Sequence, residues 1–279
     1  MNSTILANHL SVNYSEEGPY ESPVIIFIHG FPFNKSMWKP QVEALKDSYR
    51  VITYDVRGHG DTETGNEDFS IELFVSDLLG LMDALNVQNA ILCGLSMGGY
   101  IALRAIVAHP ERFDALILSD TQCIADTPEA REKRMKTIAS IKVNGVKKYA
   151  DESVKNLFSP ESFTTKQASI LAIRKMIVST SRQSLSYTLL ALAGRKETCS
   201  SLSKIVVPTL IMVGNNDIIT PPAAARMLHE GIHGSLLHIV QQAGHLPNLE
   251  NPDDFNFQLK LFLHRFAKPP AVLNTTVGD

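Results

Sequence analysis

The sequence contains little of what marks several common classes of protein. It has three cysteines in 279 residues, Cys93, Cys123 and Cys199, which are odd in number and widely spaced. This usage argues against a disulfide framework and against a zinc site, and it is typical of a reducing compartment. No apolar run reaches the length that a bilayer-spanning helix needs. We therefore expect a cytoplasmic protein that does not insert into a membrane.

An excess of basic residues is also missing. The formal net charge is −3, so the sequence offers no positive field for nucleic acid or for an anionic membrane surface. Residues 1–4 lack a positive region followed by an apolar stretch, and we expect no signal peptide. With 44% hydrophobic and 20% charged residues, the composition is that of a globular protein. The length suits one large α/β domain with an insertion.

Short β-rich runs alternate with longer helical patterns, which predicts a mostly parallel sheet covered by helices. A hairpin over residues 4–14, turning at Asn8-His9, opens the chain. A helix is expected from Ile71 onward, with Ser70 as its N-cap. The other strand candidates are near-continuous apolar runs, as in strands buried on both faces, and bring the total to eight: 24–28, 51–54, 90–93, 115–118, 209–213 and 236–240.

The pattern changes between residues 121 and 201, where the sequence is rich in helical signals and poor in strands. Gly145 and Pro160 interrupt this region. We expect residues 1–120 and 202–279 to form the sheet-containing core and residues 121–201 to form a helical cap over the carboxyl edge of the sheet. The tail after Phe266 is expected to be loose.

The run Gly94-Leu95-Ser96-Met97-Gly98 lies between an apolar segment at 90–93 and a helical pattern at 100–107. A strand, a tight glycine-flanked turn and a helix would hold Ser96 at a sharp corner with its hydroxyl exposed. A Cβ atom two residues to either side would crowd such a turn. Ser96 is therefore a candidate nucleophile, and the alternative is an ordinary serine in a glycine-rich turn.

His245 is the best candidate among nine histidines for the base that activates Ser96. It follows the last predicted strand, in Ala243-Gly244-His245-Leu246-Pro247, and lies C-terminal to the serine. A loop after a sheet strand is able to point an imidazole across the carboxyl edge. His29 and His59 lie in glycine-flanked loops, where bracing by hydrogen bonds is the expected role.

Two aspartates compete to orient His245. Asp217 follows the strand at 209–213, and Asp120 ends the strand before it. Asp217 lies in the loop that usually supplies this acid, which favours it. A carboxylate there accepts the second imidazole N–H and stabilises the imidazolium. Asp120 would then be a structural carboxylate at the start of the cap.

Backbone amides are expected to bind the oxyanion. One is Met97, directly after the nucleophile at a helix N-terminus. The other is Phe31 in the segment His29-Gly30-Phe31-Pro32, because Pro32 has no N–H. Cys93, on the preceding strand, is expected to be inert core.

Together these segments resemble the α/β-hydrolase superfamily over nearly the whole chain. The matching pieces are 29–32, 55–60, 94–99, 214–217 and 244–245. Within the superfamily, the chain is similar to serine carboxylesterases and the 3-oxoadipate enol-lactonase-like group. The resemblance implies a triad of Ser96, Asp217 and His245, with no metal and no organic cofactor. A serine at position 96 argues against the dehalogenases and epoxide hydrolases of this superfamily, which use an aspartate nucleophile.

The expected function is cleavage of small carboxylic esters or lactones. Two alternatives keep the triad: perhydrolysis or carbon–carbon hydrolysis, and a ligand receptor or signalling protein built on the hydrolase fold. Apolar side chains near the site loops and in the cap predict a mainly apolar cavity: Phe33, Trp38, Ile124, Phe158, Tyr187 and Leu246. No residue is assigned to a substrate carboxylate, and the open candidates are Arg104, Arg131, Arg134, Arg174, Arg182 and Arg195.

Overall fold

The computed structural model describes residues 2–266. Eight strands form a single sheet in the order β1-β2-β4-β3-β5-β6-β7-β8. β1 and β2 pair antiparallel, β2 is antiparallel to β4, and all other neighbours are parallel. The strands are β1 (Asn2–Ala7), β2 (Leu10–Glu17), β3 (Val24–Ile28), β4 (Arg50–Tyr54), β5 (Ala90–Leu95), β6 (Phe113–Ser119), β7 (Thr209–Gly214) and β8 (Leu236–Val240).

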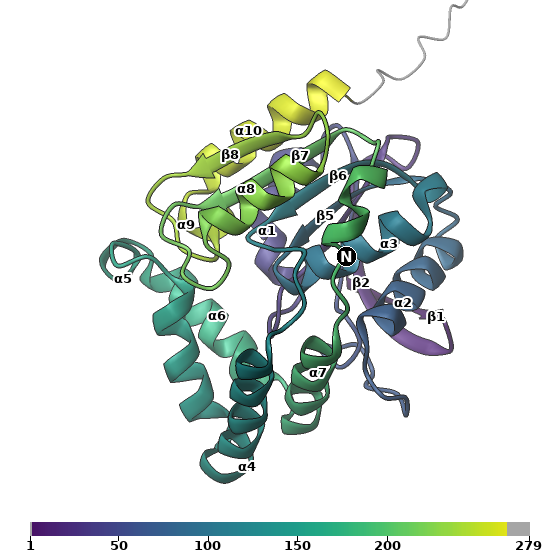
Figure 1. Cartoon of the computed structure of the whole chain (residues 1–279). Coiled ribbons are helices and arrows are strands. Elements are labelled where there is room, and N and C mark those ends of the chain that lie inside the picture. Colours follow the sequence, from purple (N-terminus) through teal and green to yellow (C-terminus); the bar gives the residue numbers. More distant parts are fainter. Residues whose placement is uncertain (1, 267–279) are drawn as a thin grey trace, which may run out of the picture.

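Helices cover both faces of this sheet, which confirms the predicted fold class (Figure 1). The α-helices are α1 (Lys39–Leu45), α2 (Ile71–Ala84), α3 (Met97–Ala108), α4 (Pro128–Leu157), α5 (Ser162–Thr165), α6 (Gln167–Ser179), α7 (Arg182–Gly194), α8 (Pro222–Gly231), α9 (Pro247–Glu250) and α10 (Pro252–Phe266). Short 3-10 helices are η1 (Lys35–Trp38), η2 (Pro110–Arg112) and η3 (Cys199–Lys204). None of the helices within residues 2–266 is long and apolar enough to cross a membrane.

Alternation along the buried strands builds two cores. In β3, Ile26 and Ile28 face the core formed with α2, α3 and α8, whereas Ile25 and Phe27 face the core formed with α1 and α10. This is the two-residue period of a strand that is covered on both sides. The hairpin turns at Asn8-His9 as predicted, with positive φ at both residues, and Ser70 caps α2 by accepting from Leu73 N.

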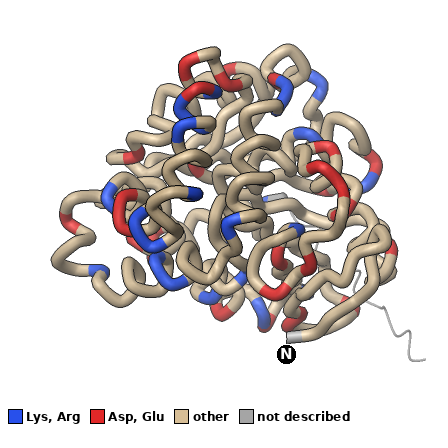
Figure 2. The backbone as a smooth tube through the Cα atoms, turned by 90° about the horizontal axis from the view of Figure 1, so that it is seen from below, with Lys and Arg blue, Asp and Glu red and all other residues tan. Residues whose placement is uncertain are grey.

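Helices α4 to α7 lie between β6 and β7 in the chain and form a group of their own beyond the sheet (Figure 1). Gly145 interrupts α4 with a φ of 83°, at the position where the sequence predicted a break. The expected division into a core at 1–120 and 202–279 and a cap at 121–201 stays a prediction. The tail after Phe266 lies outside the described residues. Acidic and basic residues are interspersed over the face seen from below (Figure 2).

The argument from cysteine number and spacing against disulfides was wrong for two of the cysteines. Cys123 and Cys199 form a disulfide with a Cα–Cα distance of 4.9 Å, although 76 positions separate them in sequence. They lie at the two ends of the helical insertion, which return to the same place: Thr198 N donates to Cys123 O at 2.8 Å. Spacing along the chain therefore did not measure distance in space, and the argument from cysteine usage to a reducing compartment loses its support. Cys93 is free and buried.

Candidate active site

Ser96 occupies the corner between β5, which ends at Leu95, and α3, which begins at Met97. Its φ of 54° and ψ of −111° lie outside the regions that non-glycine residues favour. The corner is held to β6 and the loop after it: Ser96 N donates to Ser119 O at 2.9 Å, and Thr121 Oγ1 donates to Ser96 O at 2.8 Å. The predicted strand–turn–helix elbow is therefore present, with a half-buried serine at its tip.

The glycines around Ser96 are required by close backbone approaches. A Cβ atom on Gly94 would lie 2.3 Å from the Gly98 carbonyl oxygen. A Cβ atom on Gly98 would lie 2.1 Å from the carbonyl oxygen of Ile28 at the end of β3. Both distances are far below van der Waals contact, so the turn closes only with glycine at these positions.

His245 and Asp217 form a buried pair at the carboxyl edge of the sheet. His245 Nδ1 lies 2.8 Å from Asp217 Oδ2. Asp217 also accepts from Ile219 N at 2.8 Å and from Thr220 Oγ1 at 2.7 Å. Burial opposes ionisation of Asp217, but the charge and hydrogen bond of His245 and the other donors outweigh it and hold the pKa of Asp217 below its usual value. With its proton on Nδ1, the imidazole keeps Nε2 available as a base.

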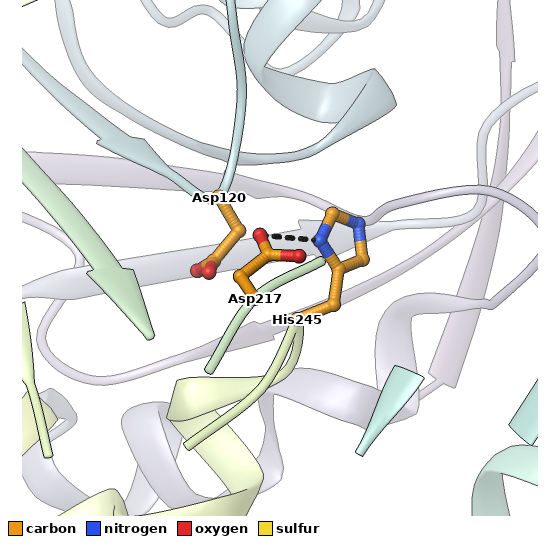
Figure 3. A group of neighbouring side chains, drawn as sticks. All are labelled: Asp120, Asp217 and His245. Carbon is orange, nitrogen blue, oxygen red and sulfur yellow. Dashed lines mark hydrogen bonds and ion pairs between the residues drawn. The ribbon is translucent and has the colours of Figure 1, made fainter. Parts of the chain in front are cut away.

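Asp120 lies beside Asp217, and Figure 3 shows Asp217 between Asp120 and His245. Asp120 Oδ1 accepts from Gly214 N at 2.9 Å, and Oδ2 accepts from Ser119 Oγ at 2.6 Å. Burial, followed by the negative charge of Asp217, raises the pKa of Asp120 well above its usual value. Asp120 thus has its own hydrogen-bond partners beside Asp217, and no hydrogen bond joins it to His245 among the described residues.

The same three side chains are the group best placed to ligate a metal among residues 2–266. Ligand atoms of Asp120, Asp217 and His245 all lie within 4.8 Å of one another. Each of the three already has hydrogen-bond partners within the protein. The hydrogen-bond network therefore accounts for this cluster.

Glu250, which the sequence analysis did not single out, holds the loop that carries His245. Its Oε1 accepts from Gly244 N at 2.8 Å and from Leu246 N at 3.2 Å, one residue to either side of the histidine. Its Oε2 accepts from Ser159 N and Ser162 Oγ, both at 2.7 Å. The buried carboxylate thus ties the histidine loop to the segment that follows α4. The sequence did contain a signal for this role, because Glu250 is an acidic residue in the helical turn that follows His245.

His29 braces the loop that contains Phe31. Its Nε2 accepts from Val56 N at 2.9 Å, and its Nδ1 lies 2.8 Å from Gly30 O. Burial is the main reason that the pKa of His29 is lowered to about 4, so the ring is neutral and donates to Gly30. His59 lies against both His29 and Phe31, with ring centroids 5.3 and 5.9 Å apart. Both histidines therefore have the bracing role that the sequence predicted.

A cavity of about 490 Å³ brings the site residues together, and Phe31, Ser96, Met97 and His245 all line it. This volume is typical of a site for a small organic ligand. Asp217 does not line the cavity and lies on the Nδ1 side of His245. The remaining wall comes from the helical insertion and from the loop after β7, through residues that include Arg134, Tyr149, Leu157, Leu189 and Ile219.

The six apolar residues expected in the pocket need correction, because none is among the described residues that line this cavity. Four of them are buried in the core that α1 and α10 share with the sheet: Phe33, Trp38, Phe158 and Leu246. Tyr187 packs against Phe69, with ring centroids 5.5 Å apart, and Ile124 is 40% exposed. Closeness to a site loop in sequence did not determine which way these side chains point. The cavity also has a polar wall that contains Lys133, which the sequence did not suggest, and Arg134, one of the six arginines left open as candidates.

The fold and the elbow define a class of α/β protein that presents a side chain at a strand–helix corner to a cavity at the carboxyl edge of its sheet. The sequence matches the family model of the alpha/beta hydrolase fold over residues 23–252. The chain therefore belongs to the α/β-hydrolase family.

Its relatives include enol-lactonases and esterases, as the sequence resemblance predicted. The 3-oxoadipate enol-lactonase 2 of Acinetobacter baylyi is 28% identical over 94% of this chain and 97% of that protein. An esterase from Thermogutta terrifontis, described with malate bound, has a TM-score of 0.91 at 30% identity over 96% of this chain and 100% of its own. The enol-lactonase from Burkholderia xenovorans has a TM-score of 0.87 at 29% identity, over 94% of this chain and 100% of that chain.

Proposed function

We propose that this protein is a serine hydrolase that cleaves small carboxylic esters or lactones through an acyl-enzyme on Ser96. In this mechanism His245 is the general base and acid, Asp217 orients it, and the N–H groups of Phe31 and Met97 bind the oxyanion. The observation that carries the proposal is that Ser96, His245, Phe31 and Met97 line one cavity, while Asp217 bonds the far nitrogen of His245. The enol-lactonase and esterase relatives support the same reaction class.

The reaction proceeds in two acyl transfers. His245 Nε2 takes the Ser96 hydroxyl proton as Oγ bonds to the substrate carbonyl carbon, and the carbonyl oxygen becomes an oxyanion. Collapse breaks the bond to the leaving oxygen, which receives the proton from His245. Water then attacks the acyl-enzyme with His245 again as base, and the acid and free Ser96 are released. Asp217 stabilises the imidazolium in both halves.

The helical insertion is proposed to act as the cap, with its boundaries at 121 and 201. It supplies α4 and α7 residues to the cavity wall, among them Tyr149 and Leu189. A lid of this kind limits the size of the acyl group and keeps bulk water from the reacting atoms.

Substitution of the nucleophile tests the proposal directly. Ser96→Ala should lower kcat for 4-nitrophenyl butyrate by about 10⁴- to 10⁶-fold, because triad members act as a unit. Ser48→Ala, at an exposed serine that does not line the cavity, is the control. A fluorophosphonate should label Ser96, as located by mass spectrometry. Near-normal turnover by folded Ser96→Ala protein, or a label on Cys93 instead, would refute the serine mechanism.

A further inference from the structure

The cavity is bounded by one face of α4. Residues three or four positions apart on a helix share a face, and the lining residues of α4 follow this spacing on both sides of the Gly145 interruption. They are Ala130, Lys133, Arg134 and Thr137 before Gly145, and Tyr149, Ser153, Asn156 and Leu157 after it. This face thus presents two adjacent cations to the same space as Ser96.

The charge of this wall is not balanced by acidic residues. Asp126 is the one acidic residue among the described residues that line the cavity. Its two carboxylate oxygens are taken by two guanidinium groups: Oδ2 accepts from Arg134 Nε, and Oδ1 accepts from Arg195 Nη1. Arg195 is buried and lies over the ring of Tyr100, 4.5 Å from its centroid. Two guanidinium groups on one carboxylate leave one positive charge in excess.

Lys133 adds a second positive charge. Within residues 2–266 it has no ion-pair partner at or below 4.0 Å, whereas Lys136, on the next turn, pairs with Glu132 at 2.8 Å. Lys133 is exposed, so it lies at the open side of the cavity. Arg134 is half-buried and directs Nε and Nη2 to Asp126, which leaves Nη1 for another acceptor. Both cations therefore have donors available to a ligand.

We propose that Lys133 and Arg134 bind a carboxylate on the acyl part of the substrate, so that the preferred esters are half-esters of dicarboxylic acids. This inference rests on the proposed function, because the ester carbonyl must lie at Ser96. The same cavity is also lined by Leu157, Leu189 and Ile219, whose apolar side chains suit the methylene chain of such an acid. A carboxylate has the planar acceptor geometry that guanidinium and ammonium donors bind best.

The test compares charged and neutral esters of equal length. The probes are monoethyl succinate, glutarate and adipate, each beside the ethyl ester of an unbranched monocarboxylic acid, with acid release measured by titration. For at least one length, wild-type kcat/KM should favour the half-ester. Lys133→Met should lower the ratio of half-ester to neutral kcat/KM by about tenfold, the usual effect of removing one charge-assisted hydrogen bond.

Three further variants sharpen the comparison. Lys133→Glu should invert the preference, because like charges repel. Arg134→Gln should lower the same ratio. Lys136→Met removes a lysine from the same helix outside the cavity and should leave both rates unchanged. Added salt should weaken the wild-type preference, since Lys133 is exposed to solvent.

The outcomes separate this inference from the proposed function. Turnover of the neutral esters that disappears in Ser96→Ala supports the hydrolase by itself. If that turnover is present but no half-ester is favoured and the Lys133 variants leave the ratio unchanged, the carboxylate site is refuted and the hydrolase stands. If Ser96-dependent turnover is found for no ester of either series, the proposed function fails.

Discussion

Asp217 Oδ2 lies 2.8 Å from His245 Nδ1, and the same oxygen accepts from Thr220 Oγ1 at 2.7 Å. The pair is buried, so the hydrogen bond fixes both the orientation of the imidazole and the nitrogen that carries its proton. Asp120 lies beside this pair, within 4.8 Å of both residues, and accepts hydrogen bonds of its own from Gly214 N and Ser119 Oγ. The pKa values of the two aspartates are shifted in opposite directions: that of Asp217 is lowered, whereas that of Asp120 is raised.

This difference predicts unequal effects of the same substitution. Asp217→Asn should lower kcat by about 10⁴-fold, because an amide favours the wrong imidazole tautomer and does not stabilise the imidazolium by charge. Asp120→Asn introduces a group of similar shape at a residue that bonds to Gly214 N and Ser119 Oγ and leaves the Asp217–His245 hydrogen bond in place, so it should change kcat much less. Steady-state kinetics on variants of matched thermal stability check this. An inactive Asp120→Asn enzyme beside an active Asp217→Asn enzyme would reassign the acid to β6.

Glu250 offers a second test, because it positions His245 without touching substrate. Its two oxygens accept four hydrogen bonds, two from the histidine loop and two from residues 159–162. Glu250→Gln keeps the volume but replaces one acceptor oxygen by an NH₂ donor, so one of the two pairs of hydrogen bonds is lost. We expect kcat to fall by about 10- to 100-fold, since small displacements of a catalytic group are costly.

A structural role alone would lower stability, and with it the number of competent sites, but would leave kcat per competent site unaffected, so the readout must separate the two. Fluorophosphonate titration counts competent sites, and kcat per titrated site should fall in Glu250→Gln. Glu230→Gln, an exposed glutamate on α8, is the control and should leave kcat unaltered. Unchanged kcat per titrated Glu250→Gln site would show that Glu250 serves stability only.

The backbone of the site was predictable from the sequence, because strand order and glycine placement carry that information. The apolar runs located all six parallel strands within a residue or two, and the run at 94–98 located the elbow. His245 and Asp217 followed from their places after β8 and β7, since parallel strands end at one edge of the sheet. These inferences needed only local patterns and the topology that they imply.

Side-chain directions and pairings across the insertion were not predictable in this way. Phe33 and Trp38 follow the loop at 29–32, yet both side chains are buried in the core that α1 and α10 share with the sheet. Cys123 and Cys199 pair because the two ends of the insertion meet, which no spacing rule reveals. The role of Glu250 depends on four donors from separate segments. Each of these features is set by tertiary packing rather than by local sequence.

Acid sensitivity is the last expectation, and it follows from the neutral histidines under the Phe31 loop. Burial, with the neighbouring His29, lowers the pKa of His59 to about 3, although Asp55 and two backbone contacts oppose the shift. An unfolded histidine titrates near pH 6.5. Between about pH 6.5 and 3 the unfolded chain therefore binds a proton at His59 that the folded chain does not, so the free energy of unfolding falls as the pH falls.

Replacing His59 should remove this contribution. In His59→Asn the amide N–H₂ takes over the donor role of Nδ1, which lies 3.0 Å from Arg57 O. Urea unfolding between pH 6 and 4.5 should show a shallower fall of the free energy of unfolding than in wild type, by up to about 1.4 kcal/mol per pH unit. His264→Asn, at an exposed position on α10, should leave the slope unchanged. Equal slopes for wild type and His59→Asn would mean that His59 is already protonated in the folded protein at pH 4.5, contrary to its burial.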